Sequence, residues 1–206
     1  MADASLKLIY FKGKGRAEMA RLLLAAAGKQ YEDARLSQDE WKEQFKQRSP
    51  FGGAPCLEVN GKMYGQSMAV STFLAKEFGF YGSSNTDGLV IDGVLQSIQD
   101  IMQIAVKFMF EKDEGKKQEL ATAFKDTETP RFFGYYEALL KENGTGYFVG
   151  SKLSLADIAV YDLFTGMMAP RLGSVDSFPL LKALVDKVGA DQKIKAYMAS
   201  RPDTPF

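Results

Sequence analysis

A stretch rich in glycine and serine, from Gly79 to Gly88, divides the chain into two halves with different hydrophobic patterns. Before this stretch, short apolar runs typical of strands alternate with segments whose apolar residues recur at helical spacing. After it, the apolar residues follow helical spacing only. We therefore expect an α/β domain over residues 1–80, a linker over 81–88 and an all-helical domain over 89–206.

The first half predicts the element order β-α-β-α-β-β-α, with one parallel pair of strands and one antiparallel hairpin. Asn60-Gly61 is a strong signal for the tight turn of that hairpin. Gly28 and Gly79 each follow a helical pattern, where glycine commonly ends a helix. The expected strands are 6–11, 30–36, 56–59 and 62–64, and the expected helices are 16–27, a short one with Trp41 and Phe45, and 67–78.

The second half predicts helices over 89–110, 116–143, 154–168, 179–188 and 193–200, with Pro130 either kinking its helix or starting a second one. The first of these helices has apolar residues on more than one side. Ile104, Val106, Phe108 and Phe110 lie off its main stripe. A helix that is apolar on two sides is usually buried on two sides, so the second side should meet another subunit, a ligand or both.

Composition removes whole classes of chemistry. The 206-residue chain has no histidine, which excludes Ser-His, Cys-His and histidine-metal mechanisms. Its one cysteine, Cys56, excludes an internal disulfide and a multi-cysteine zinc site. Acidic and basic residues balance at 26 each, which argues against a nucleic-acid or anionic-membrane partner held by bulk charge. With no secretory pattern in residues 1–7 and no run long enough to span a bilayer, we expect a cytoplasmic protein.

The segment from Tyr10 to Glu18 is the first candidate for chemistry. Tyr10 ends the first strand, and a loop with Gly13 and Gly15 then leads into an apolar helix. The start of a helix is electropositive and rich in N–H donors, although a tyrosine that ends a strand is more often a packing residue. The glycines match neither a dinucleotide-binding fingerprint nor a P-loop.

Two further short motifs are candidates for binding. Ala54-Pro55 precedes a strand, and a cis bond there is a hypothesis. Gln66-Ser67 stands at a helix start, where Ser67 can serve as the N-cap and the helix terminus can still bind a carboxylate.

In this order and spacing, the motifs resemble the cytosolic glutathione transferases. The similarity extends over the whole chain and is greatest to the sigma-like class, which includes helminth forms and glutathione-dependent prostaglandin D synthases. The residues that carry it are Tyr10-Phe11, Gly15-Arg16-Ala17-Glu18, Trp41, Pro50 to Pro55, Leu57 to Gly61, Gln66-Ser67, Val149-Gly150 and Leu153 to Asp157. The resemblance implies a thioredoxin-like N-terminal domain, an all-helical C-terminal domain and glutathione as cosubstrate, with no metal required.

The resemblance also implies residue roles at the glutathione site. Tyr10 would be catalytic, its hydroxyl donating a hydrogen bond to the glutathione sulphur. Gln66 and Ser67 would hold the γ-glutamyl carboxylate, and the backbone of Ala54, beside Gly53, would pair with the cysteinyl portion. The further expected glutathione contacts are Phe11, Arg16, Trp41, Lys46 and, across a homodimer interface, Asp100. Without the resemblance, Asp100 would be interpreted as an ordinary surface acid.

The lysine that would bind the glycyl carboxylate is not fixed by the resemblance. The stretch from Trp41 to Pro55 is one residue longer than expected, so counting back from Pro55 selects Lys46, whereas counting forward from Trp41 lands on Phe45. We choose Lys46, with Lys42 as the alternative.

The resemblance implies conjugation of glutathione to apolar electrophiles, a detoxification reaction. The expected electrophile pocket contains Phe11, Gly15, Arg16, Met102, Leu163 and Phe206, although core packing is an equal alternative for Met102 and Leu163. A glutathione-dependent isomerase or peroxidase and a noncatalytic ligand-binding relative remain alternatives, and helminth relatives also bind planar ligands such as haem. Prostaglandin D synthase relatives carry a tryptophan near Lys107 that this chain lacks, which argues against that isomerase activity.

Two reactive residue types are expected to be structural. Ser154-Leu155-Ala156-Asp157 is a capping-box pattern with Asp in place of Glu or Gln, so Asp157 should stabilise a helix start and not take part in catalysis. Cys56 opens an apolar strand and should be buried. Its position disfavours a thiol-disulfide oxidoreductase.

Overall fold

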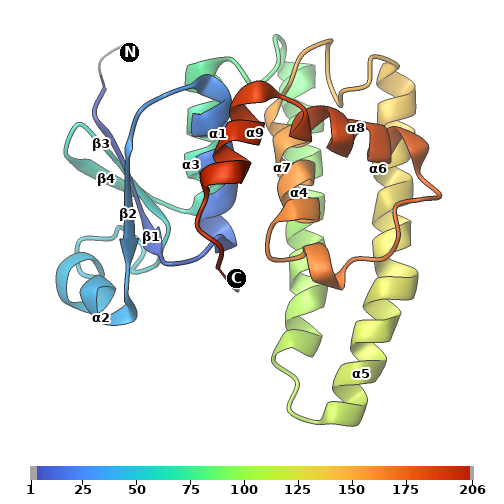
Figure 1. Ribbon diagram of the computed structural model, residues 1–206, viewed down its shortest axis with the longest axis horizontal. Coiled ribbons are helices and arrows are strands. Elements are labelled where there is room, and N and C mark those ends of the chain that lie inside the picture. The colour runs from blue at the N-terminus through green and yellow to red at the C-terminus, as the bar shows by residue number, and fades with distance from the viewer. Residues whose placement is uncertain (1–3, 205–206) are drawn as a thin grey trace. The chain divides into compact units, whose positions relative to one another are not determined.

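The computed structural model describes residues 4–204, which form two compact units (Figure 1). The first unit contains residues 4–80 and 190–204, and the second contains residues 81–189. Helix α9 (Gln192–Ser200) belongs to the first unit because it packs against α1 (Glu18–Ala27). This differs from the expected helical domain over 89–206. Helix α4 (Asn85–Met109) also begins inside the expected linker, because the side chain of Ser84 caps its first turn.

The first unit contains a four-stranded sheet in the order β2-β1-β3-β4. Strand β1 pairs in parallel with β2 and antiparallel with β3, and β3 and β4 form the expected hairpin. Asn60 and Gly61 have positive φ angles of 50° and 82°, as a tight two-residue turn requires. The strands are β1 (Leu6–Phe11), β2 (Glu32–Leu36), β3 (Cys56–Val59) and β4 (Lys62–Gly65).

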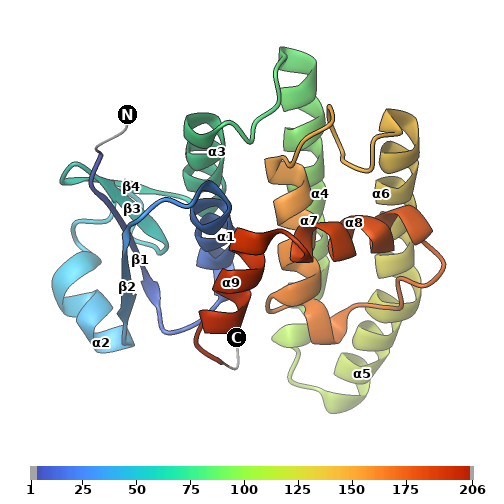
Figure 2. The same ribbon diagram turned by 45° about the horizontal axis from the view of Figure 1, so that its top comes forward.

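Helices cover both faces of this sheet (Figure 2). Helices α1 and α3 (Ser67–Phe78) lie on one side, and α2 (Gln38–Glu40) lies on the other. Leu8 and Ile9 are both fully buried, so each face of β1 faces a core. Ile9 packs in a cluster with Trp41 and Phe45, on the side of α2. Because side chains alternate along a strand, Tyr10 shares the opposite face with Leu8, on the side of α1.

The second unit is built from helices, as the sequence predicts. Helix α7 packs against both α4 and α8, and six of its residues are 0 or 1% exposed. Figure 1 shows α5 and α6 as one rod, with a π-helical turn over Phe124–Glu128 between them. Pro130 lies in the first turn of α6 and so starts a second helix. The remaining elements are α5 (Glu114–Ala123), α6 (Thr129–Asn143), α7 (Leu155–Thr165), a 3₁₀ turn (Ala169–Arg171) and α8 (Pro179–Gly189).

Helix α4 is apolar on more than one side, although one expected residue differs. Phe110 and Val106 are exposed, whereas Phe108 is buried and its ring lies 5.2 Å from that of Phe124. Within residues 4–204, α4 alone is long and apolar enough to cross a membrane. It packs against α5, α6 and α7, as the core helix of a helical domain does.

The expected capping box at the start of α7 is confirmed. The carboxylate of Asp157 accepts hydrogen bonds from the backbone N–H groups of Phe148 and Ser154, at 2.9 and 2.7 Å, and from the Ser154 hydroxyl at 2.6 Å. Burial raises the pKa of Asp157 to about 6, although these hydrogen bonds oppose the shift. The buried carboxylate thus joins the 148–154 loop to the central helix, which supports a structural role.

We expect Asp157→Ala to lower the free energy of unfolding by about 2 to 4 kcal/mol, because it leaves two buried N–H groups without their acceptor. Urea unfolding followed by circular dichroism measures this change. Asp186→Ala removes an acid paired with Lys182 on the exposed side of α8 and should leave the unfolding curve unchanged. An Asp157→Ala protein as stable as the wild type would contradict the structural role.

Candidate functional site

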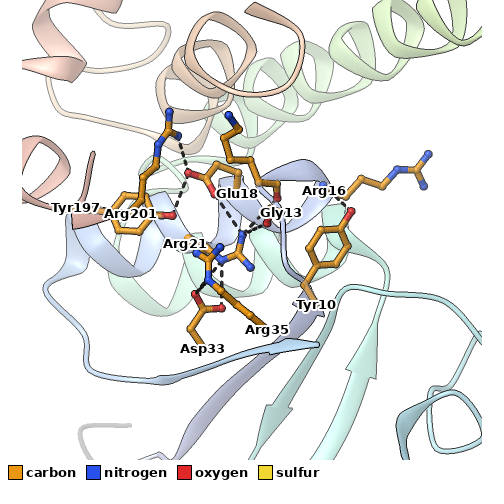
Figure 3. A network of polar contacts seen from close by, with 10 residues as sticks. Tyr10, Gly13, Arg16, Glu18, Arg21, Asp33, Arg35, Tyr197 and Arg201 are labelled. Atoms are coloured by element: carbon orange, nitrogen blue, oxygen red, sulfur yellow. Dashed lines mark hydrogen bonds and ion pairs between the residues drawn. The ribbon is translucent and has the colours of Figure 1, made fainter. Parts of the chain in front are cut away.

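Tyr10 lies at the end of β1, next to the turn that begins the first helix. Its side chain is half-buried, and its hydroxyl oxygen accepts a hydrogen bond from the backbone N–H of Arg16 at 3.2 Å (Figure 3). A phenol carries one proton and two lone pairs. Because the Arg16 N–H occupies a lone pair, the phenol proton remains available for a different acceptor.

Gly15 makes room for this hydroxyl. It has a φ angle of +42°, and a Cβ atom built on it would lie 2.5 Å from the Tyr10 oxygen. Both the backbone angle and the close approach therefore require glycine. The 3₁₀ turn Gly15–Ala17 then leads directly into α1, so its N–H groups and the helix terminus make the surroundings of the phenol electropositive. The Arg16 side chain is exposed.

Phe11 connects the Tyr10 strand to the aromatic cluster on the other face of the sheet. Its ring centroid lies 5.3 Å from that of Tyr10 and 5.9 Å from that of Trp41, which is 5% exposed. Trp41 therefore contributes mainly to the core, and little of its surface is left for a ligand.

A π-helical turn over Trp41–Phe45 accommodates the extra residue noticed in the sequence. The N–H of Lys46 bonds to the carbonyl of Trp41 at 2.9 Å, five residues back, as an inserted residue in a helix produces. Phe45 is thereby buried, whereas Lys46 is exposed. Lys42 is also exposed, and its Nζ lies 3.8 Å from an Asp39 carboxylate oxygen. Of the residues selected by the two ways of counting, only Lys46 can meet a carboxylate.

The peptide bond between Ala54 and Pro55 is cis, as hypothesised. Ala54 is half-buried, and the neighbouring Gly53 is exposed, with its carbonyl accepting the Ser49 hydroxyl at 2.8 Å. Cys56 is fully buried, as expected, and burial raises the pKa of its thiol. A thiol that resists ionisation is a poor nucleophile, which supports a structural role for Cys56.

Gln66 and Ser67 stand at the start of α3, but their cap roles differ from the expectation. Gln66 is the N-cap and Ser67 is the first helical residue, so the expected N-cap role of Ser67 is wrong. Gln66 has a φ angle of 73°, which is strained for a residue with a side chain. Strained backbone of this kind gathers at ligand sites, which is consistent with binding at this helix start.

The remaining expected site residues belong to the second unit or lie outside the description. Asp100 is exposed on α4 and lines a hollow with Lys107, Arg131 and Tyr135. Met102 is half-buried, and Leu163 is 4% exposed, so Leu163 contributes to the core of its unit. Phe206 lies outside the described residues.

A buried ionic network beside Tyr10 was not anticipated from the sequence (Figure 3). Arg21 of α1 is fully buried and pairs with Glu18 and with Asp33, at 3.3 and 3.2 Å. Burial alone would lower the pKa of Arg21, but the neighbouring acids outweigh it and the pKa is raised. A Glu and an Arg three residues apart inside an otherwise apolar helical pattern were the signal that could have revealed this network.

Two residues from α9 and the segment after it complete the network. Arg201 and the Tyr197 hydroxyl both donate to Glu18, at 2.7 and 3.0 Å. Burial, followed by the charge of Glu18, raises the pKa of Tyr197, so its hydroxyl keeps its proton. Within residues 4–204, no group of three or more Cys, Asp or Glu side chains is arranged to hold a metal ion.

Comparisons with known proteins show which family the chain resembles. The family model "Glutathione S-transferase, N-terminal domain" matches residues 6–76, and "Glutathione S-transferase, C-terminal domain" matches residues 99–201. S-crystallin SL11 of Nototodarus sloanii is 37% identical over 205 residues, covering 98% of this chain and 99% of that protein.

Two solved structures are similar over nearly their full length. A Nu-class glutathione S-transferase from Haemonchus contortus has a TM-score of 0.90 and 34% identity, with 99% of this chain and 100% of that chain covered. Monomeric Na-GST-3, a glutathione S-transferase from Necator americanus, has a TM-score of 0.86 and 35% identity, with 98% and 100% covered.

We expect Gly15→Ala to lower glutathione-dependent turnover by about 10- to 100-fold, because its Cβ would displace the Tyr10 hydroxyl and cost that group its hydrogen bond to a charged acceptor. Gly61→Ala is the matched control. Gly61 also has a positive φ angle, but a Cβ there meets nothing within 4 Å. Steady-state rates of the two variants distinguish the clash with the Tyr10 hydroxyl, which only Gly15→Ala introduces, from the backbone strain, which both introduce. An equal loss of turnover in both variants would contradict the role of Gly15 in positioning Tyr10.

Proposed function

Because the chain belongs to the glutathione S-transferase family, we propose that it conjugates glutathione to small apolar electrophiles, with the Tyr10 hydroxyl stabilising the glutathione thiolate. The observation that carries this proposal is the hydrogen bond from the Arg16 N–H to the Tyr10 oxygen. It holds the phenol in place beside a helix start while its proton stays available for the sulphur.

The energy of one hydrogen bond is sufficient for this role. A thiol with a pKa of about 8.5 is mostly protonated at neutral pH, although its thiolate is the nucleophile. A hydrogen bond to a charged group contributes roughly 1.5 to 3 kcal/mol. At about 1.4 kcal/mol per pKa unit, this lowers the thiol pKa by about one to two units. The thiol pKa then lies at about 6.5 to 7.5, so roughly a quarter to three quarters of the sulphur is ionised at pH 7.

The same unit supplies groups suited to the rest of the tripeptide. Gln66 and Ser67 at the start of α3 would hold the γ-glutamyl carboxylate, since a helix start attracts anions. Ala54 would pair its backbone with the cysteinyl part beside Gly53. Trp41 and Lys46 would hold the glycyl carboxylate, with Lys42, which is also exposed, as the alternative.

The second substrate is proposed only as a class. Phe11, Gly15 and Arg16 combine apolar surface with one cation beside Tyr10, which suits apolar electrophiles. A glutathione-dependent isomerase or peroxidase would use the same ionised sulphur, and planar ligands such as haem would occupy apolar surface without reaction. Rates with an aromatic halide, a hydroperoxide and a prostaglandin endoperoxide distinguish these activities. Glutathione binding without turnover of any of the three would overturn the proposal.

We expect Tyr10→Phe to keep glutathione binding and to lower kcat by about 10- to 100-fold, because it removes only the hydrogen bond to the sulphur. The pKa of bound glutathione, followed by the ultraviolet absorbance of the thiolate, should rise by about one to two units. Tyr64→Phe removes a hydroxyl from an exposed tyrosine of β4 and serves as the control. An unchanged rate in Tyr10→Phe would remove Tyr10 from the mechanism.

We also propose that the protein is a homodimer in which Asp100 contacts the amino group of glutathione bound to the other subunit. Exposed apolar residues in both units support an interface. Phe51, 68% exposed, lines an apolar groove of about 550 Å³ beside β4 and α3, and Phe110 is 76% exposed at the end of α4. One relative differs from this proposal, since Na-GST-3 is monomeric.

Sedimentation at micromolar concentration should give twice the chain mass of 22.8 kDa. Phe51→Ser and Phe110→Ser, measured separately, should each shift the protein toward the monomer if both surfaces are buried in the interface. A wild-type monomer would refute the dimer and leave Asp100 without its proposed role.

A further inference from the structure

A continuous series of polar contacts connects the C-terminal helix of the first unit to the loop beside Tyr10 (Figure 3). We propose that Glu18, Arg21 and Arg201 are positioning residues, which hold this loop so that the Tyr10 hydroxyl stays aligned with the glutathione sulphur. This inference rests on the proposed role of Tyr10. None of the three residues needs to touch glutathione.

Arg21 holds the loop directly. Its Nη1 donates to the carbonyl oxygen of Gly13 at 2.7 Å and lies 3.4 Å from that of Lys14. These two residues immediately precede Gly15, which leaves room for the Tyr10 hydroxyl, and Arg16, whose N–H donates to it. The Arg21 guanidinium carbon also lies 5.9 Å from the centre of the Tyr10 ring. A shift of Arg21 would therefore move both the donor to the phenol and the charge beside its ring.

Glu18 fixes the orientation of Arg21. Its side chain is 1% exposed, and its Oε2 accepts from Arg21 Nη1 at 3.3 Å. The other oxygen, Oε1, accepts from Arg201 at 2.7 Å and from Tyr197 at 3.0 Å. Both oxygens of a buried carboxylate are thus occupied. Removal of Arg201 would leave that carboxylate free to reorient toward Arg21 and to pull it from the loop carbonyls.

The network is more polar than packing alone requires. In the part of the chain that the structure describes, Nη2 of Arg21 is buried and has no hydrogen-bond partner. An apolar side chain of similar volume would fill this space without the cost of desolvating a charge. An apolar side chain, however, could not donate a hydrogen bond to the Gly13 carbonyl, as Arg21 does. The retained arginine is therefore better explained by control of the loop than by stability.

Arg201 is the residue of choice for the test. It is 16% exposed, so its replacement at the edge of the network opens little space in the core. Helix α9 keeps a separate anchor in Ile194, which is fully buried. The neighbouring Lys193 is exposed, and its Nζ lies 3.4 Å from the Ala27 carbonyl oxygen. Arg201→Met therefore removes the contact with Glu18 and leaves the helix packed.

The experiment compares Arg201→Met, Arg201→Lys and the control Lys193→Met in the full chain. The readouts are the pH dependence of the thiolate absorbance of bound glutathione, kcat and KM with an aromatic halide, and the melting temperature. We expect Arg201→Met to raise the apparent thiol pKa by about half a unit to one unit and to lower kcat about 3- to 10-fold, with little change in KM for glutathione. Arg201→Lys should recover most of this loss, and Lys193→Met should match the wild type.

A purely structural role would lower the melting temperature of Arg201→Met and leave the thiol pKa unchanged, and this result would overturn the inference. If Arg201→Met does not fold, Tyr197→Phe replaces it, because it removes a single hydroxyl from Glu18 and should shift the thiol pKa in the same direction.

The double variant Tyr10→Phe/Arg201→Met separates this inference from the proposed function. If Arg201 acts through Tyr10, the double variant should have the thiol pKa of Tyr10→Phe alone. Additive shifts would overturn the inference while the role of Tyr10 stands. If Tyr10→Phe alone shifts nothing, the proposed function itself fails.

Discussion

The buried charge of Arg21 is the constraint around which the first unit is organised. A fully buried guanidinium needs compensating acids, and these come from Glu18 on its own helix and Asp33 on β2. It also donates to the Gly13 carbonyl, in the loop that follows β1. The Arg21 side chain thus connects α1, the edge strand β2 and the loop beside Tyr10. The position of this loop depends on where the buried guanidinium lies.

The β3–β4 hairpin and the helix ends of the first unit were predictable because each rests on local chemistry. Asn60-Gly61 selects a hairpin, and Gly28 and Gly79 adopt the left-handed conformation that ends α1 and α3. The capping box at Ser154 was predictable for the same reason. The roles of Tyr10 and Lys46 came from family resemblance and stay predictions.

The features that the sequence did not reveal depend on contacts between distant residues. Nothing near Arg201 indicates that it pairs with Glu18, 183 positions away, and the assignment of α9 to the helical domain followed from its pattern alone. Phe108 lies off the main apolar stripe of its helix, as Val106 and Phe110 do, but unlike them it is buried. Its ring packs against Phe124 of the π-helical turn after α5, a contact that the sequence pattern does not show. Ser67 matched the preferred residue type for an N-cap, yet the N-cap is Gln66, which has a positive φ angle, and α3 begins at Ser67 as expected.

The path of the chain explains why a residue near the C-terminus can act on a group near the N-terminus. The chain leaves the first unit after residue 80 and returns to it at residue 190, so the helical unit is inserted between two parts of the unit that carries Tyr10. The first 80 residues by themselves therefore lack the cation that neutralises the buried Glu18 from the side of α9. Without Arg201, the Glu18 carboxylate would have Arg21 as its remaining cation and would attract it more strongly. Arg21 is also the residue that donates to the loop beside Tyr10. The contacts around the Tyr10 loop therefore include one made across 183 positions of sequence, between Arg201 and Glu18.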